Sequence, residues 1–255
     1  MESKSVTLIT GASSGIGYEM AKVFAKHKHN LILVARQEDS LKRLAELLTR
    51  EQGVKVHVIT MDLANPEAAS ELYEKVKKLD LEVDTLINNA GFGYVGLFHE
   101  EDVQRDIDMI YVNIKSLTEL TKLFSRDMVK RMRGSILNVA STGSYHAGPY
   151  TAVYYATKAY VLSFTEAIAK ELKPYNIVVT ALCPGATKTN FAKRAGRRDN
   201  KAAMSPEKVA EAGYKALMKK KTVVVPGIAN KLLVKLPRSL VKGFVGRYQR
   251  KLAGK

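Results

Sequence analysis

The feature that most constrains the fold is a regular alternation between short apolar runs and longer segments with helical periodicity. The runs at 5–10 and 30–35 are almost continuously apolar, which is typical of strands covered on both faces. Helical segments follow them at 18–28 and 38–52. We predict strands at 5–10, 30–35, 54–60, 83–89, 134–140, 176–182 and 222–226. The alternation therefore predicts an α/β protein with a doubly wound parallel sheet and helices on both faces.

Two helix starts carry capping signals. Asn65 precedes Pro66, and Ser205 precedes Pro206. Asn and Ser are favoured caps and Pro fits the first helical position, so we expect helices to begin at these two prolines. A further helix is expected over 152–172.

The composition excludes several classes of protein. With 255 residues, 46% of them hydrophobic and 26% charged, the chain fits one globular domain. Cys183 is the only cysteine, so no intrachain disulfide can form. The chain enters a strand pattern at once, which leaves no room for a signal peptide, and no apolar run reaches the roughly 18 residues of a membrane span. We expect a cytoplasmic protein. We also expect no metal site, because the spacing of the histidines is not that of metal ligands. The histidines are His27, His29, His57, His99 and His146.

A glycine-rich turn, TGASSGIG, follows the first predicted strand at 10–17. In a doubly wound sheet, ligands bind beyond the carboxyl ends of the strands. Glycines there allow a tight turn and a close approach of backbone to a pyrophosphate, which also meets the N-terminus of the next helix. The turn predicts a dinucleotide site, and the alternative is an ordinary strand–helix connection.

The ends of the second and third strands bear on the choice of cofactor. Arg36 follows Ala35, where an Asp or Glu would bind a free ribose 2′-hydroxyl. A cation there favours a 2′-phosphate, although a solvated surface charge is the alternative. Asp62 and Leu63 follow the third strand and are placed to meet the adenine, or to form a plain loop. The sequence NNAG at 88–91 ends the fourth strand with polar groups suited to holding a loop and a cofactor.

Tyr154 and Lys158 are four residues apart and share one face of a predicted helix. This spacing alone decides nothing, because it recurs at Tyr18 and Lys22, Tyr73 and Lys77, and Tyr111 and Lys115. Ser141 lies thirteen residues before Tyr154, just after the carboxyl end of a predicted strand.

Taken together, TGASSGIG, NNAG, Asn113, Ser141, YYATK and the Pro184-Gly185 turn resemble the short-chain dehydrogenase/reductase family, from Thr10 to about Gly227. The resemblance implies a single-domain Rossmann fold with a seven-stranded sheet, and a nicotinamide cofactor. It also implies a catalytic tetrad of Asn113, Ser141, Tyr154 and Lys158. In it, Tyr154 is the general acid or base, Lys158 favours its phenolate form, Ser141 holds the carbonyl oxygen, and Asn113 holds a water. Without the resemblance, the alternative for Asn113 is an amide satisfied within a capped or kinked helix.

With Arg36 present, the cofactor is predicted to be NADP(H). Its predicted contacts are Gly11, Ser13, Ser14, Gly15, Ile16, Gly17, Arg36, Asp62, Leu63, Asn89, Ala90, Gly91, Tyr154, Lys158, Pro184, Gly185, Thr187 and Thr189.

The substrate is predicted to be an apolar ketone or secondary alcohol, because aromatic residues gather near the expected mouth of the site. The predicted pocket residues are Phe92, Tyr94, Tyr145, His146, Tyr150 and Phe191, whereas Tyr155 and Tyr160 are expected to pack on other faces of their helix. The loop 186–204 carries KRAGRRDNK, which is a solvated lid or a contact for an acidic carrier. A 3-oxoacyl-thioester reductase and a catalytically silent NADPH sensor or scaffold are the alternative functions.

The last segment, 228–255, is a basic amphipathic tail beyond the domain at 1–227. Residues 188–255 contain 19 Lys and Arg against 3 Asp and Glu, and no acidic residue follows Glu211. Pro237 is expected to divide an apolar stripe into two short helices; the stripe is Leu232, Leu233, Leu236, Leu240, Val241, Phe244 and Val245. The tail either packs on the protein or makes a peripheral contact with a membrane surface. We expect a homo-oligomer, dimer or tetramer, and no nucleic-acid binding.

Overall fold

The computed structural model describes residues 4–191, 195 and 203–252. A seven-stranded sheet runs through it in the order β3-β2-β1-β4-β5-β6-β7, with every pair parallel. The strands are β1 (Ser5–Thr10), β2 (Asn30–Ala35), β3 (Val56–Thr60), β4 (Glu82–Asn88), β5 (Gly134–Val139), β6 (Ile177–Leu182) and β7 (Val223–Val224). The predicted doubly wound sheet is confirmed, and β7 is shorter than expected.

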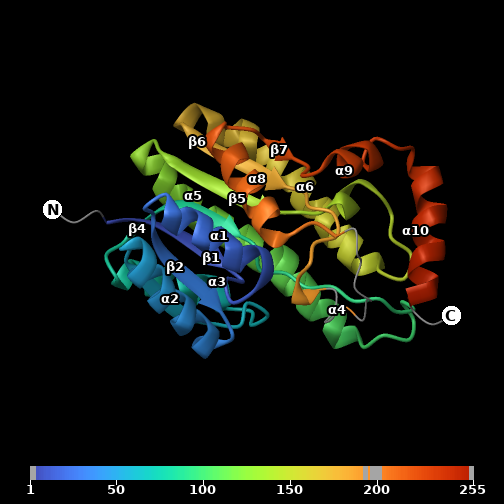
Figure 1. The fold of residues 1–255 in the computed structure, drawn as a ribbon, viewed down its shortest axis with the longest axis horizontal. Helices are drawn as coiled ribbons and strands as arrows, with labels where there is room; N and C mark the ends of the chain where they lie inside the picture. The colour runs from blue at the N-terminus through green and yellow to red at the C-terminus, as the bar shows by residue number, and fades with distance from the viewer. Residues whose placement is uncertain (1–3, 192–194, 196–202, 253–255) are drawn as a thin grey trace.

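The helices occupy both faces of this sheet (Figure 1). They are α1 (Gly15–Lys26), α2 (Glu38–Gln52), α3 (Ala68–Lys78), α4 (Val103–Ile110), the π-helix η1 (Tyr111–Ser116), α5 (Leu117–Arg131), the short 3-10 helix η2 (Thr142–Tyr145), α6 (Ala152–Leu172), the 3-10 turn η3 (Lys173–Tyr175), α8 (Pro206–Met218), α9 (Ile228–Leu233) and α10 (Arg238–Leu252).

The core has one layer on each side of the sheet, because neighbouring residues of a strand point to opposite faces. Ile9 of β1 packs with α1, α2 and α8 in the first layer. Leu8, the preceding residue, packs with α3 and α5 in the second. Both side chains are completely buried, so the continuous apolar runs of the sequence reflect strands covered on both faces.

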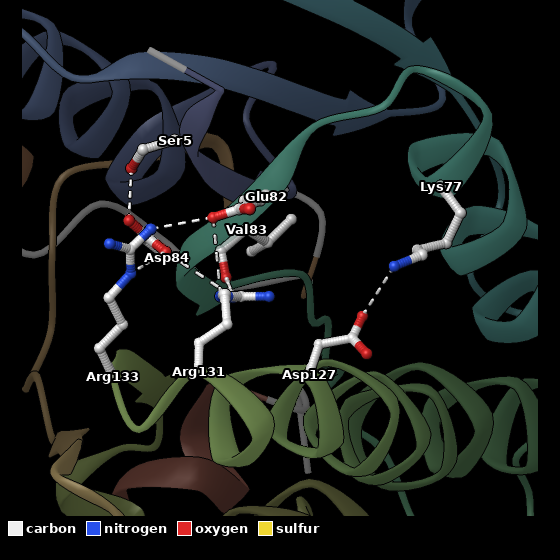
Figure 2. Close-up of polar contacts among 8 residues, drawn as sticks. All are labelled: Ser5, Lys77, Glu82, Val83, Asp84, Asp127, Arg131 and Arg133. Atoms are coloured by element: carbon white, nitrogen blue, oxygen red, sulfur yellow. Dashed lines mark hydrogen bonds and ion pairs between the residues drawn. The ribbon is translucent and has the colours of Figure 1, made fainter.

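The amino-terminal edge of the sheet is held by paired charges (Figure 2). Arg133 lies 2.9 Å from Glu82 and 3.5 Å from Asp84, and Arg131 lies 3.7 Å from Asp84. The guanidinium of Arg131 also donates to the carbonyl oxygen of Val83, 3.0 Å away. This network ties the end of α5 and the start of β5 to β4, at the edge of the sheet away from the carboxyl ends of the strands.

Two local features differ from the sequence prediction. Helix α3 begins at Ala68, not at Pro66, because the N–H of Ala68 donates to Asn65 in a turn, 3.1 Å. The sequence between β4 and β5 has helical patterns up to about Arg133, but the structure divides this region at η1, where one wider turn separates α4 from α5. The helix at Pro206 is confirmed, with the hydroxyl of Ser205 accepting from the N–H of Lys208.

The tail forms α9 and α10 at the end of the molecule farthest from the N-terminus (Figure 1). Pro237 lies between them, as predicted, but α10 has 15 residues and is not short. Val241 and Gln249 of α10 are buried, so this helix is docked on the body of the protein. Within the described ranges, no helix combines the length and apolar character that crossing a membrane requires.

Candidate active site

One large cleft of about 1570 Å³ lies along the carboxyl ends of strands β1 to β6. Its lining begins with the turn after β1 and continues over the segments that follow the other strands. Because parallel strands end at the same edge, motifs far apart in the sequence meet here, as predicted.

The turn after β1 is shaped by glycines that leave no room for a side chain. Gly11 and Gly15 have φ angles of +66° and +59°, which side chains disfavour. A Cβ on Gly17 would lie 2.4 Å from the carbonyl oxygen of Gly11. The amide of Asn89 donates to the carbonyl oxygens of Thr10, 2.9 Å, and Gly11, 3.1 Å. Gly17 itself does not line the cleft, so it shapes the turn from behind.

The N-terminus of α1 opens into the same cleft. The helix starts at Gly15, and its cap residue Ser14 makes no side-chain hydrogen bond to the first turn. Ser13, Ser14, Gly15 and Ile16 line the cleft. Backbone N–H groups at a helix N-terminus bind anions, so this corner suits a pyrophosphate.

Arg36 and Asp62 meet at a neighbouring corner, at the ends of β2 and β3. The guanidinium of Arg36 lies 3.4 Å from the carboxylate of Asp62, and both side chains are partly exposed. Asp62 also accepts from the N–H of Ala64, 3.0 Å. An exposed ion pair is weakly held, so Arg36 can turn to an incoming phosphate at little cost.

The predicted cofactor contacts line this cleft, with the single exception of Gly17. They are Gly11, Ser13, Ser14, Gly15, Ile16, Arg36, Asp62, Leu63, Asn89, Ala90, Gly91, Tyr154, Lys158, Pro184, Gly185, Thr187 and Thr189.

Ser141 caps η2 just after β5. Its hydroxyl oxygen accepts from the N–H of Gly143, 3.0 Å, while its own N–H donates to the hydroxyl of Ser144, 3.2 Å. The Ser144 hydroxyl in turn donates to the carbonyl oxygen of Lys158, 2.6 Å. Ser141 is therefore fixed in place and linked to α6, and its own hydroxyl proton can still be donated into the cleft.

Lys158 is buried beside Tyr154. Its ammonium donates to the carbonyl oxygen of Val139, 2.8 Å, and lies 6.0 Å from the centre of the Tyr154 ring. Burial lowers the pKa of Lys158 to about 8. A Cβ on Gly91 would lie 3.2 Å from the side-chain nitrogen of Lys158. The glycine therefore lets the loop after β4 pack against the Lys158 ammonium.

The ring of Tyr154 is held between neighbours in the cleft. It packs on Phe191, with 5.5 Å between ring centres, and edge-on against Tyr155 at 6.1 Å. A Cβ on Gly93 would lie 2.6 Å from the ring. Sequence reasoning missed Gly93, although its place in GFG just after NNAG was a signal.

Asn113 lies in η1 and is completely buried. Its amide donates to the carbonyl oxygen of Phe92, 3.0 Å, and to the hydroxyl of Thr157, 3.0 Å. Its amide oxygen accepts from the N–H of Phe92, 3.1 Å. The residues that line the cleft do not include Asn113. The hydrogen bonds of Asn113 therefore fix the loop after β4 against α6.

Of the predicted pocket residues, Phe92 and Phe191 line the cleft and the other four lie elsewhere. The hydroxyl of Tyr94 donates to Asp106, and Arg105 stacks on its ring at 4.4 Å. This pair holds Tyr94 against α4, and Tyr94 does not line the cleft although Arg105 does.

The other three are displaced for separate reasons. Tyr145 packs into the core next to Cys183, and burial raises its pKa. His146 is buried with its Nε2 3.2 Å from the carbonyl oxygen of Leu233, and since a carbonyl only accepts, Nε2 carries the proton. Tyr150 lines a second, smaller groove beside α10.

Tyr155 is a correction in the other direction. It was expected to pack on another face of α6, but its ring lies against Gly148 and Gly143 and lines the cleft. Tyr160 is exposed and stacks on Phe164, as expected for a packing role.

The tail completes the cleft, which the sequence did not predict. Leu233 of α9 and Val245 and Gln249 of α10 line it. Gln249 is only 3% exposed, and its amide oxygen has no hydrogen-bond partner among the described residues. The apolar stripe was the available signal, but it did not show where the helices pack. In the described part of the chain, no cluster of His, Cys, Asp and Glu could hold a metal ion.

A family model described as short chain dehydrogenase matches residues 5–200. The chain is 34% identical over 248 residues to dehydrogenase/reductase SDR family member 7B of Xenopus tropicalis, covering 91% of this chain and 80% of that protein. Among solved structures, the short-chain dehydrogenase of Sphingobium yanoikuyae in complex with NADPH has a TM-score of 0.83 at 30% identity, covering 98% of this chain and 96% of that one.

A second solved structure is also similar. The bulky-bulky ketone specific alcohol dehydrogenase of Comamonas testosteroni has a TM-score of 0.78 at 28% identity, covering 98% of this chain and 94% of that one. The matched model spans well over half of the chain, and the fold and the cleft agree with it. The protein is therefore an oxidoreductase of the short-chain dehydrogenase/reductase family.

Proposed function

We propose that the protein is an NADPH-dependent reductase or dehydrogenase that acts between a nicotinamide cofactor and an apolar ketone or secondary alcohol. The observation that carries this proposal is that Ser141, Tyr154 and Lys158 share one cleft with the glycine turn after β1. A proton donor, a buried cation and a site for a dinucleotide are the parts that carbonyl reduction needs.

The residues of the cleft fit an NADP(H) molecule. The glycine turn and the N-terminus of α1 would hold the pyrophosphate. Arg36 would bind the 2′-phosphate, and the residue before it is Ala35 rather than an acidic residue that would repel this phosphate. Lys158 would bind the ribose near the nicotinamide. The NADPH bound to the Sphingobium yanoikuyae relative supports the choice. When bound, the nicotinamide supplies a hydride to a carbonyl carbon or accepts one from an alcohol carbon.

The chain's own residues would manage the proton. Ser141 would donate a hydrogen bond to the substrate oxygen and orient it. Tyr154 would give that oxygen its proton in reduction and take it back in oxidation. Lys158, while protonated, favours the phenolate that Tyr154 becomes. Asn113 would serve by fixing the loop that carries Phe92, and the water predicted for it remains a proposal.

An apolar wall supports the proposed substrate class. Phe92, Tyr155, Phe191, Leu233 and Val245 line the cleft on the side of Tyr154 and the tail. These side chains favour a bulky apolar ketone over a charged one. The ketone named for the Comamonas testosteroni relative supports the same class.

Two alternative functions make different demands on the chain. A silent NADPH sensor or scaffold has no need of the proton donor that the cleft contains. A 3-oxoacyl-thioester reductase would use the basic residues of 193–201, all of which lie outside the described residues.

Three further parts of the proposal concern assembly and location. A homo-oligomer is supported by α4, which exposes Val103, Ile107 and Ile110 at helical spacing. A cytoplasmic location fits the single buried Cys183, and a peripheral membrane contact involves 228–255. The domain boundary near Gly227, where φ is +87° and α9 begins, also remains a prediction.

A ketone panel tests the proposal directly. The purified protein is mixed with NADPH or NADH and with aromatic, alicyclic and long-chain ketones, and the loss of reduced cofactor is followed by absorbance. We expect turnover of bulky apolar ketones with NADPH in preference to NADH. Tight NADPH binding by fluorescence without turnover of any ketone or alcohol would instead establish the sensor.

A further inference from the structure

Helix α9 exposes an apolar stripe to solvent. Ile228 and Leu232 of α9 are 78% and 63% exposed, and Leu236, just beyond the helix, is 48% exposed. They are spaced four residues apart, so the two within the helix share a face and Leu236 continues the line. Leu233 and Val245 point the other way and line the cleft. The apolar residues of the tail are thus divided between the protein and the outside.

Exposed cations lie along this stripe in the sequence and on the neighbouring helix α10. Lys231 and Lys235 alternate with it along the chain. Lys242, Arg247 and Arg250 of α10 line a groove of about 510 Å³ together with Gly243, Gly246, Pro149 and Tyr150. A Cβ on Gly243 would meet nothing within 4 Å, so the glycine leaves the groove open between the cations. We call these three apolar residues and five cations the tail surface.

The cations of the tail surface differ from those at the other end of the molecule. Arg131 and Arg133 are paired with Glu82 and Asp84, as Figure 2 shows. In the described part of the chain, no carboxylate lies within ion-pair distance of the five tail cations, and the sequence has no acidic residue after Glu211. Their charge is therefore available to an outside partner.

The tail surface is also held in place. Val241 and Gln249 of α10 are buried against the body of the protein, and His146 donates to the carbonyl oxygen of Leu233, the last residue of α9. Because the two helices are already docked, a partner would not have to order a free chain, and less entropy is lost on binding.

We propose that the tail surface docks on an anionic lipid bilayer, with the stripe of α9 among the lipids and the cations of α10 against their phosphates. The inference goes beyond hydride transfer and does not depend on it. Apolar side chains flanked by cations are the combination that interfacial helices use. Since the opposite faces of α9 and α10 line the cleft, docking would also bring the cleft close to lipid-dissolved ketones.

Other partners fit the tail surface less well. A nucleic acid or an acidic protein would use the cations but would leave three large apolar side chains in water. A second copy of the chain would place its own five cations against these five, which costs free energy. A bilayer with anionic headgroups satisfies both parts of the surface.

Sedimentation with lipid vesicles tests the proposal. The full chain is mixed with vesicles of phosphatidylcholine alone, or of equimolar phosphatidylcholine and phosphatidylserine, at low and high salt. We expect it to sediment with the anionic vesicles at low salt, to be released by salt, and to stay in solution with the neutral ones. Inorganic phosphate at the same phosphate concentration should not compete, which separates a bilayer from a free phosphate ligand.

Two variants with matched controls locate the contact. Lys242→Gln, Arg247→Gln and Arg250→Gln together should lower partitioning about 100-fold, from about 1 kcal/mol for each charge. Arg43→Gln, Arg50→Gln and Lys130→Gln remove the same charge elsewhere and should change it little. Ile228→Ser, Leu232→Ser and Leu236→Ser should also release the protein. The same change at Val103, Ile107 and Ile110, which also lie on a helix but among acidic residues, should not.

Three results would overturn the proposal. The first is no sedimentation with anionic vesicles at low salt. The second is an equal loss of sedimentation in the tail variants and their controls. The third is a wild-type dimer, measured by light scattering, that the apolar tail variant alone converts to a monomer; the stripe would then be a subunit contact. Thermal unfolding of each variant confirms that it is folded.

Discussion

The two walls of the cleft are built in different ways. In the proposed function, the wall that would face the cofactor includes two short motifs, the glycine turn before α1 and the NNAG loop after β4. The wall that would face the substrate has residues from α6, α9 and α10 and from the loops after β4 and β6. The first wall needs only a few neighbouring residues, whereas the second exists only when the tail has packed.

This difference explains what each wall tolerates. A backbone wall depends on the absence of Cβ atoms at a few positions and fails abruptly when one is added. A wall of side chains can exchange one apolar group for another and change its preference without losing the fold. We therefore expect changes in the first wall to abolish binding, and changes in the second to redirect it.

Gly17→Ala should have the largest effect. The new Cβ would lie 2.4 Å from the carbonyl oxygen of Gly11, so the turn must move. Overpacking of this kind lowers the free energy of unfolding by about 1–3 kcal/mol. Each kcal/mol lowers Tm by about 2–4 °C in a chain of this size. NADPH binding, measured by fluorescence, should be lost. Gly243→Ala, where a Cβ meets nothing, is the control and should leave both quantities unchanged or improved. Normal NADPH affinity in Gly17→Ala would refute the backbone wall.

Arg36→Ala tests the side chain that would bind the 2′-phosphate of the cofactor. Losing a charge-assisted phosphate contact should weaken NADPH binding roughly ten- to hundred-fold, and leave NADH binding unchanged. Arg43→Ala, on α2 and outside the cleft lining, is the matched control. An unchanged ratio of the two dissociation constants would remove Arg36 from the site.

Lys158→Met tests the buried cation through pH. Burial lowers the pKa of Lys158 from 10.5 to about 8. Between these values the unfolded chain binds a proton that the folded protein does not, so this group makes the free energy of unfolding rise with pH. The slope reaches at most about 1.4 kcal/mol per pH unit. In urea unfolding without cofactor, the wild type should gain stability relative to Lys158→Met across this window. Parallel curves would show that the lysine is not buried as described.

Gln249→Leu tests the side-chain wall and should have the smallest effect. The amide oxygen of Gln249 is buried without a partner among the described residues, so its removal should not lower Tm. NADPH affinity should stay the same, because the cofactor wall is separate. The KM for bulky ketones should change several-fold. A changed NADPH affinity with an unchanged KM would reverse the assignment of the two walls.

The same contrast separates what the sequence could predict from what it could not. The sheet, the glycine turn and the positions of Ser141, Tyr154 and Lys158 follow from local patterns, and the structure gathers them in one cleft. The predicted pocket was mostly misplaced, since Tyr94, Tyr145, His146 and Tyr150 were chosen for their position along the chain. Hydrogen bonds from Tyr94 to Asp106 and from His146 to the carbonyl oxygen of Leu233 hold two of them where they do not line the cleft. The cleft residues Leu233, Val245 and Gln249 depend on where α9 and α10 pack, which no local pattern encodes.

The central claim is that the hydroxyl of Tyr154 donates the proton and that NADPH binding does not depend on this hydroxyl. One variant tests this claim most directly. Tyr154→Phe keeps the ring that packs on Phe191 and removes only the hydroxyl. NADPH affinity and ketone turnover are measured on the same preparation. We predict an NADPH dissociation constant like that of the wild type, and turnover lower by about 100-fold or more, the usual contribution of general acid catalysis. Turnover close to that of the wild type, with a ketone that the wild type reduces well, would contradict the account.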